Sequence, residues 1–315
     1  MLVLDRPLIA LDEAARDLGL TPEGARRLWR AVGLPDPPEG ATLRDDDADL
    51  LALVAAGVHD DESLEAGVQH ARVIGAALTR IAESEGDAIG DDPQAAARAH
   101  RLVDALHRRH LEAALARRQD RADAGLPVAI GFVDLVGFTA ISRRLADVEL
   151  SRLLSRFENL THEVVTEHGG RVVKTIGDEA MFALDNPAAA VMAGLHLTAG
   201  HADDAGLPDV HVGIAYGSAL ARDGDYFGAV VNLGRRITDV SPPGAVVVSD
   251  ELRIALADDL DFEWKSLGPR DLKDVGAVPL WTVRPATTAA DALRVLESLA
   301  RGDIDVDQAL ALIPS

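Results

Sequence analysis

The sequence predicts an α+β protein in which a helical N-terminal part precedes a part with alternating strands and helices. Residues 8–118 carry apolar side chains at helical spacing, interrupted by glycines and short polar stretches. From residue 128 onward, short apolar runs of strand length alternate with longer helical patterns. The order strand, helix, strand, strand, helix, strand in this second part is that of a split βαβ unit. We therefore expect an all-α domain followed by an α+β domain.

Charge and composition exclude several classes of protein. The 315 residues include 52 Asp and Glu against 31 Lys and Arg, and the formal net charge is −21. Such a charge disfavours nonspecific binding to nucleic acids or anionic membranes. The absence of cysteine excludes disulfides, thiolate zinc sites and cysteine nucleophiles. The longest apolar run, residues 50–58, is too short to span a bilayer, and no signal-peptide pattern begins the chain, so a cytoplasmic protein is expected.

The first helices of the N-terminal part have clear boundaries. Gly19 ends the first helix, and Thr21 with Pro22 begins the second. The second helix carries three arginines, Arg26, Arg27 and Arg30. This helix–glycine–helix spacing resembles the helix-turn-helix of MerR-like regulators, which would place the arginines against DNA.

A helical bundle used as a regulatory module is the alternative interpretation of this part. Residues 1–120 contain 14 arginines, no lysine and 23 acidic residues, a balance that suits phosphate neutralisation poorly. We therefore expect a regulatory domain and no nucleic-acid partner, and we keep a DNA-binding regulator as the alternative hypothesis.

Two longer helices are predicted over residues 62–83 and 93–118, separated by a polar loop over 83–92. The second contains the cationic run His107–His110. Histidine titrates near neutral pH, so this run is either a pH-responsive element or an ordinary solvated helix surface. The domains expected in the whole chain are a regulatory domain (1–118), a linker (119–127), an α+β domain (128–285) and a C-terminal helical hairpin (286–315).

The α+β domain is predicted element by element from its patterns. Its expected strands and helices are the strand 128–135, the helix 147–167, the hairpin strands 171–175 and 180–184, the helix 187–205, the strand 210–216, the helix 232–240 and the strands 246–249 and 280–283. A polar turn is expected over 222–226, and Gly169 with Gly170 ends the helix 147–167.

Two acidic residues are predicted at adjacent turns of this domain. Asp134 ends the first strand, and Asp178 follows 44 residues later at the tip of the hairpin. Paired carboxylates supply the hard oxygen ligands that Mg²⁺ or Mn²⁺ prefers. Each aspartate alone would also suit an ordinary turn. Gly137 would let the backbone approach a phosphate, and the amides of Phe138 and Thr139 at a helix start suit an anion.

Four segments indicate the class of protein more specifically than the two aspartates do. The usual nucleotide-binding motifs, the phosphate-loop lysine motif and GxGxxG, are absent from the sequence. They are FVDLVGFT (132–139), KTIGD (174–178), DYFGAVVNLGRR (225–236) and LKDVGAVPL (272–280). In this order and spacing they resemble the catalytic domain of class III nucleotidyl cyclases, over roughly residues 123–285. The N-terminal half resembles the helical regulatory domain of some soluble, autoinhibited adenylyl cyclases.

The resemblance implies a ferredoxin-like βαββαβ fold and a role for each signature residue. The implied metal ligands are Asp134, Asp178 and Leu135. The implied purine-selecting residues are Lys174 and Asp225, and Lys273 would contact the triphosphate. The implied catalytic residues are Asn232, which orients the ribose, and Arg236, which stabilises charge on the α-phosphoryl group.

The implied reaction is the conversion of ATP to 3′,5′-cyclic AMP and pyrophosphate with two Mg²⁺ or Mn²⁺ ions per active site. The implied assembly is a homodimer with shared active sites, in which the metal aspartates come from one chain and most other contacts from its partner. A cation at 174 and an acid at 225 suit adenine's ring nitrogen and exocyclic amine. A guanylyl cyclase remains the alternative enzyme.

Overall fold

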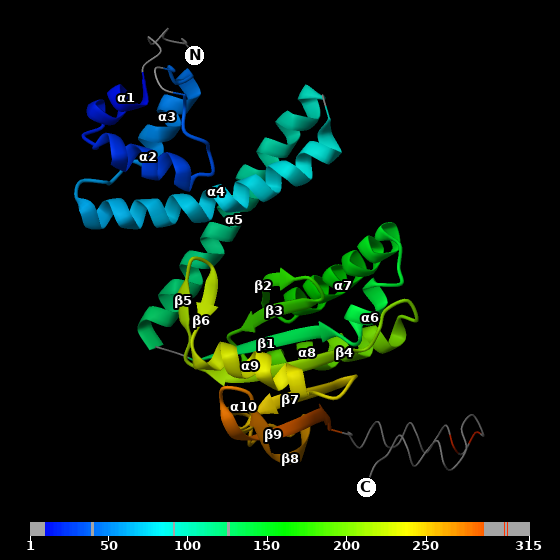
Figure 1. The fold of residues 1–315 in the computed structure, drawn as a ribbon. Coiled ribbons are helices and arrows are strands. Elements are labelled where there is room, and N and C mark those ends of the chain that lie inside the picture. Colours follow the sequence, from blue (N-terminus) through cyan, green and yellow to red (C-terminus); the bar gives the residue numbers. More distant parts are fainter. Residues whose placement is uncertain are drawn as a thin grey trace. The chain divides into compact units, whose positions relative to one another are not determined.

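Helices fill the first third of the chain, whereas strands and helices alternate after residue 128 (Figure 1). The α+β class is thus confirmed. The computed structural model describes residues 10–38, 41–90, 92–124, 127–286, 299 and 301. These residues belong to two compact units, 1–119 and 120–315. The predicted C-terminal hairpin, 286–315, lies outside the described residues except at 286, 299 and 301. In the described part, no helix is long and apolar enough to cross a membrane.

The N-terminal unit is built from helices around a small apolar core. Its helices are α1 (Leu11–Asp17), α2 (Pro22–Ala31), α3 (Asp45–Val54), α4 (Asp61–Ile89) and α5 (Pro93–Ala124), the last of which continues past residue 119. Thr21 caps α2 as predicted, because its hydroxyl accepts a hydrogen bond from the Gly24 amide at 3.0 Å. Leu28, Trp29 and Leu51 are buried at the centre of this core.

The two long helices extend beyond their predicted ends. Helix α4 continues through most of the expected loop, to Ile89, and α5 occupies residues 119–124 of the expected linker. The sequence between Glu83 and Ile89 contains one glycine and no proline. A single glycine costs a helix only about 1 kcal/mol, which a helix of this length tolerates.

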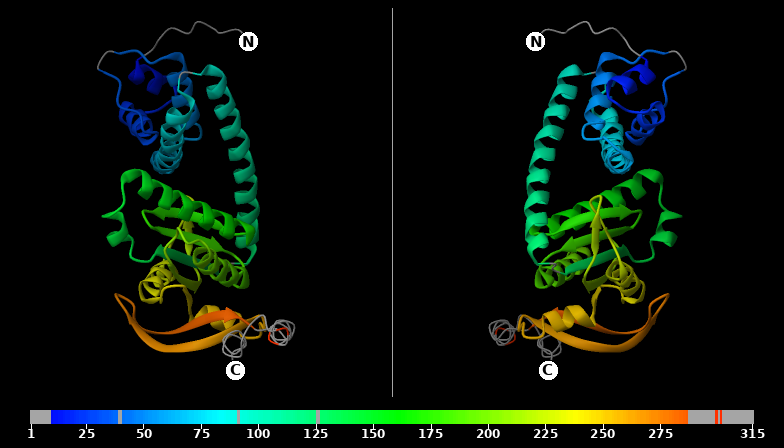
Figure 2. Two further views of the ribbon diagram at one scale, coloured as in Figure 1. Left: turned by 90° about the vertical axis from the view of Figure 1, so that its right-hand side faces the viewer. Right: turned by 90° about the vertical axis from the view of Figure 1, so that its left-hand side faces the viewer.

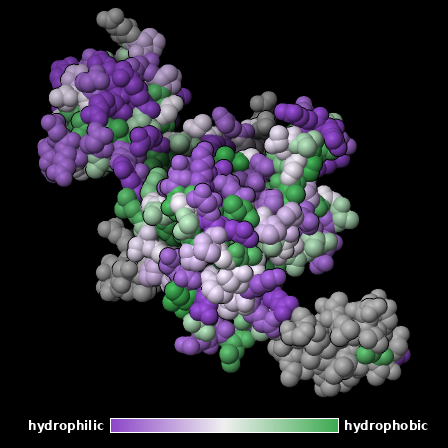
Figure 3. Space-filling view, turned by 60° about the horizontal axis from the view of Figure 1, so that its bottom comes forward, coloured by the Kyte–Doolittle hydropathy of each residue, from purple (hydrophilic) through white to green (hydrophobic). Residues whose placement is uncertain are grey.

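The three arginines of α2 contact carboxylates of their own unit. Arg26 lies 2.6 Å from Asp12 and Arg30 lies 2.6 Å from Asp36, while Arg27 pairs with Glu65. The visible face of this unit is covered mainly by hydrophilic residues (Figure 3). These ion pairs neutralise the side chains that the helix-turn-helix interpretation would use for DNA.

The second unit contains a seven-stranded sheet in the order β2-β3-β1-β4-β7-β9-β8. Its strands are β1 (Val128–Leu135), β2 (Arg171–Ile176), β3 (Glu179–Leu184), β4 (Val210–Gly217), β7 (Ala245–Ser249), β8 (Phe262–Leu272) and β9 (Gly276–Pro285). Its helices are α6 (Phe138–Ser142), α7 (Asp147–Glu167), α8 (Pro187–Asp203), α9 (Ala229–Val240) and α10 (Asp250–Ala255). The first four strands pair antiparallel in the order β2-β3-β1-β4, which is the arrangement expected for the βαββαβ plan.

Helices cover both faces of the sheet (Figure 2). Alternate residues of a strand point to opposite faces, so Val133 of β1 belongs to the core beneath α7 and α8. Its neighbour Phe132 belongs to the core beneath α9, together with Ile130 and Ile237. Helix α9 therefore packs on the face of β1 that also carries Asp134.

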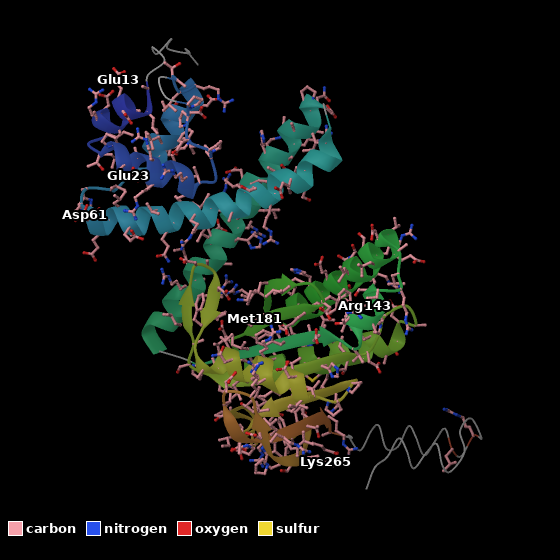
Figure 4. The ribbon with its side chains drawn as sticks, in the orientation of Figure 1. Glu13, Glu23, Asp61, Arg143, Met181 and Lys265 are labelled. Atoms are coloured by element: carbon pink, nitrogen blue, oxygen red, sulfur yellow. The ribbon has the colours of Figure 1, made fainter. Side chains whose placement is uncertain are left out.

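Several elements differ from the prediction in the second unit. The turn expected over 222–226 is a small hairpin of β5 (Leu220–Arg222) and β6 (Asp225–Phe227), and α9 begins three residues before its predicted start. Strand β8 was not predicted, because its polar residues and the irregularity at Gly268 break the alternating pattern. The exposed Lys265 lies on this strand (Figure 4).

Candidate active site

Asp134 lies near the end of β1, between the neighbouring strands β3 and β4. Its Cα is opposite Glu179 of β3 and His211 of β4. Because side chains alternate along a strand, Asp134 shares a face with Phe132 and Ile130. Asp134 is half-buried there, on the face that α9 partly covers.

Asp178 occupies the tight turn between β2 and β3, beside the end of β1. Gly177 precedes it with φ of 65°, a left-handed conformation that glycine adopts without strain. The Leu135 amide donates a hydrogen bond to the Asp178 carbonyl oxygen at 3.2 Å and so ties the turn to β1. The side chain of Leu135 is buried in the core, so only its backbone carbonyl remains as a possible metal ligand.

The electrostatics of this pair favour a divalent cation. Burial raises the pKa of Asp134 to about 7, with further contributions from the carboxylates of Asp178 and Glu179 that the nearby Arg235 opposes. Hard carboxylate oxygens with excess negative charge are the ligands that Mg²⁺ and Mn²⁺ prefer. Asp134 and Asp178 are the residues that would hold such an ion.

The two predicted purine-selecting residues lie in contact. Lys174 of β2 places its Nζ 2.5 Å from Oδ2 of Asp225, the first residue of β6. Arg171 holds the β5–β6 hairpin to β2, because its guanidinium donates to the Gly224 carbonyl at 2.9 Å and lies 4.9 Å from the centroid of the Tyr226 ring. The cation and the acid are therefore presented together.

Helix α9 carries Asn232 and Arg236 and packs unusually closely on the sheet. A Cβ at Gly234 would come within 3.0 Å of the Ile130 carbonyl oxygen. A Cβ at Gly213 of β4 would come within 2.4 Å of the amide nitrogen of Thr238. Two glycines thus permit the close approach of the helix to β1 and β4, and Gly234 serves packing in addition to its effect on helix propensity.

Arg236 is held by two carboxylates. Its Nη1 lies 3.1 Å from Oδ2 of Asp239 on the same helix, and its Nη2 lies 3.4 Å from Oδ2 of Asp274. Asp274 belongs to the turn between β8 and β9 and has a φ of 63°, which is uncommon for a residue other than glycine. The exposed Lys273 precedes it, so this contact brings the predicted triphosphate lysine beside α9.

A pocket of about 160 Å³ joins part of these residues. Lys174 and Asn232 line it together with two residues that the sequence did not indicate, Glu179 and Arg235. Met181 of β3 forms part of its wall (Figure 4). Pockets for small molecules usually measure about 300–1,000 Å³, so this one is too small to enclose a nucleotide by itself.

The remaining predicted residues lie apart from this pocket. In the described part of the chain, no hydrogen bond or ion pair joins Arg236 or Lys273 to Asp134 or Asp178. Gly137, at φ of 71°, follows the metal-site strand and precedes α6, whose first residues are Phe138 and Thr139. The carboxylate pair and the residues Arg236 and Lys273 are therefore not joined directly within the single chain.

The sequence indicated Arg236 with Asp239 only as a possible surface pair, and it indicated no role for three further charged residues of the site, Glu179, Arg235 and Asp274. Arg235 pairs with Glu179, 56 residues away, and Arg236 pairs with Asp239 and with Asp274, 38 residues away. Glu179 follows Asp178 directly and Arg235 precedes Arg236. Their position next to a predicted site residue is the feature of the sequence that could have indicated them.

Comparison with known proteins places these segments in one family. Residues 122–284 match the adenylate and guanylate cyclase catalytic domain. An adenylate cyclase of Streptomyces coelicolor is 35% identical over 265 residues, which cover 75% of this chain and 68% of that protein. An adenylate cyclase of Glutamicibacter nicotianae is 30% identical over 296 residues, covering 79% and 72%. A pH-sensitive adenylate cyclase of Mycobacterium tuberculosis is 38% identical over 165 residues, covering 51% and 41%.

The match over residues 122–284, which contain the βαββαβ strands and both aspartates, thus shows a nucleotidyl cyclase of class III. The chain belongs to the family of adenylate and guanylate cyclase catalytic domains.

Proposed function

We propose that this protein is an adenylyl cyclase that converts ATP to 3′,5′-cyclic AMP and pyrophosphate in the cytoplasm. The contact between Lys174 and Asp225 is the observation that favours ATP as the substrate. The ammonium can donate a hydrogen bond to adenine's ring nitrogen, and the carboxylate can accept one from adenine's exocyclic amine. The relatives named adenylate cyclase support the same assignment.

Each predicted site residue has its own role in the proposed reaction. Lys174 and Asp225 bind the base, Asn232 orients the ribose, and Lys273 holds the triphosphate. The Arg236 guanidinium stabilises the charge that develops on the α-phosphoryl group during attack by the 3′-hydroxyl. The two Mg²⁺ or Mn²⁺ ions held by Asp134, Asp178 and the Leu135 carbonyl would lower the pKa of that hydroxyl and neutralise the leaving pyrophosphate.

The active site is shared between the chains of a homodimer in this proposal. A pocket of about 160 Å³ leaves a nucleotide largely exposed. Among the described residues, no hydrogen bond or ion pair joins Asp134 or Asp178 to Arg236 or Lys273. Two apolar side chains beside the site, Ile176 and Phe227, are 59% and 47% exposed. A second chain would cover such side chains and complete the site.

The N-terminal unit regulates the enzyme, with autoinhibition and pH as the proposed mode and signal. The run His107–His110 on α5 is exposed and places two histidines beside two arginines, and this run is the feature that supports a response to pH. Deletion of residues 1–115 should change cyclase activity or its pH optimum. Identical pH profiles with and without these residues would contradict this part of the proposal.

The purified protein incubated with MnATP tests the proposed activity. Cyclic AMP and pyrophosphate should form in equal amounts, as measured by chromatography. Absence of product from both the full chain and residues 120–315 would contradict the proposal. A preference for GTP over ATP would instead identify a guanylyl cyclase.

A DNA-binding regulator with a nucleotide-sensing domain is the second candidate. It predicts salt-sensitive, sequence-selective DNA binding with ATP bound but not converted. The ion pairs of Arg26, Arg27 and Arg30 with acidic residues weigh against it.

A further inference from the structure

Glu179 is a buried carboxylate beside the metal site to which the proposed mechanism gives no role. The residue is only 8% exposed and lies directly opposite Asp134 in the pairing of β1 with β3. A buried charge is tolerated when it is paired, and the partner of Glu179 is the guanidinium of Arg235. The Arg235 side chain is itself half exposed, so it contacts the buried Glu179 from the solvent-exposed side of the pocket.

This ion pair connects two parts of the site that are far apart in sequence. Glu179 follows Asp178 on the β2–β3 hairpin, whereas Arg235 lies on α9 between Asn232 and Arg236. The helix packs chiefly on β1, β4 and β7, so the pair reaches across β1 to the hairpin. Both side chains also line the pocket that contains Lys174.

The charges of the pair act on Asp134. Glu179 adds a third negative charge beside Asp134 and Asp178, and Arg235 offsets it. Glu179 does not form a metal-binding group of three with the two aspartates in the described part of the chain. Its carboxylate faces Arg235, which leaves the two aspartates as the ligands.

We propose that Glu179 and Arg235 are a positioning pair that sets the charge of the metal site and holds Glu179 away from the ion. Glu179 attracts the cation without binding it, and Arg235 weakens that attraction and fixes the distance between the hairpin and α9. The inference rests on the proposed function, because the metal site belongs to that function.

Opposite changes in metal affinity distinguish this role from a structural one. Glu179→Gln removes a negative charge and should weaken Mn²⁺ binding, whereas Arg235→Gln removes a positive charge and should strengthen it. We expect changes of about threefold to tenfold, since the charges interact across a partly solvated pocket. The double variant should return close to the affinity of the unmodified protein.

The experiment measures Mn²⁺ binding to the full chain by calorimetry and by the electron paramagnetic resonance signal of free Mn²⁺. Thermal unfolding without metal checks that each variant folds, and Glu179→Asp, which keeps the charge, should keep the Mn²⁺ affinity of the unmodified protein. If Glu179→Gln is unstable, the stronger binding expected of Arg235→Gln still tests the inference. The matched control is the ion pair between Glu263 of β8 and Arg284 of β9. Glu263→Gln and Arg284→Gln should both leave the Mn²⁺ affinity unchanged.

Shifts in the same direction for both single variants, or no shift in folded variants, would overturn the inference. If the unmodified protein binds Mn²⁺ and forms cyclic AMP, such a result refutes the positioning pair alone. If the unmodified protein neither binds Mn²⁺ nor forms cyclic AMP, the proposed function itself fails.

Discussion

The Nζ of Lys174 lies 2.5 Å from the Oδ2 of Asp225, although 51 residues separate them in the chain. The contact joins β2 to the β5–β6 hairpin, and in the proposed function the two side chains bind the base. Lys174→Ala should lower kcat/KM for ATP by about 10²-fold, because a site built to hydrogen-bond a substrate loses most of its discrimination when one partner is removed. Chromatographic assays with ATP and GTP would measure this loss, and retention of the full preference for ATP would contradict the assigned role.

Arg236 is expected to act in the transition state. Arg236→Ala should lower kcat by about 10²-fold or more with little change in KM, as for other donors that stabilise developing charge. Steady-state kinetics with MnATP would separate the two constants. Arg284→Ala, on the distant β9 strand, is the control and should retain activity. A rise in KM at constant kcat would assign Arg236 to ground-state binding instead.

The ion pair with Asp274 holds part of the Arg236 guanidinium, which the proposed reaction needs at the α-phosphoryl group. The contact is exposed, so it contributes little energy, and Asp274→Asn should raise kcat by about twofold to fivefold with little change in KM. Asparagine tolerates the left-handed backbone at this position, so the change removes charge while keeping the turn. Asp274→Gly should act in the same direction. An unchanged kcat in both variants would show that the contact does not restrain Arg236.

Asp134 should make stability depend on pH when no metal is bound. Its pKa rises from 3.8 to about 7 in the folded chain, so the folded state holds the proton more tightly than the unfolded state. The resulting stabilisation is complete below the unfolded pKa and is lost as pH rises through the folded pKa. The free energy of unfolding should therefore fall between about pH 4 and pH 7, by less than ~1.4 kcal/mol per pH unit because Asp134 is partly solvated.

Urea unfolding in EDTA would measure this dependence, with Asp134→Asn as the comparison that lacks the titrating group. Stabilisation by added Mn²⁺ should increase from pH 6 to pH 8, because the metal requires the ionised carboxylate. Equal slopes for the unmodified protein and Asp134→Asn would contradict the assignment.

Much of the fold could be predicted from the sequence because its signals are local. Leu153, Phe157 and Val164 recur at helical spacing, and α7 has the predicted bounds of 147–167. The N-cap at Thr21 likewise fixes the start of α2. Strand β8 carries no such local signal, since polar residues and the irregular backbone at Gly268 interrupt its alternation.

The charge pairs that join different elements of the site could not be predicted in this way, in contrast to the local pair of Arg236 with Asp239 on one helix. The contact of Glu179 with Arg235 depends on how α9 is placed over β1, and that placement depends on Gly234 and Gly213. Neither glycine indicates its packing role in the sequence, because a glycine inside a helix or a strand is by itself only a residue that weakens that element. The signature residues could be predicted because they lie in the four sequence segments that resemble the family. The contacts of their charged neighbours depend on tertiary packing, which these segments do not indicate.

Mixing two impaired variants tests most directly whether the protein is a cyclase whose site two chains complete. In the proposed site, Asp134→Ala removes a metal ligand and Lys174→Ala removes a base contact, so each variant alone should keep at most about a hundredth of the activity. A 1:1 mixture should recover about a quarter of the unmodified activity, since half of the dimers are mixed and each holds one intact site. No recovery above the separate variants, with mixed dimers confirmed by differential tagging, would contradict the shared site.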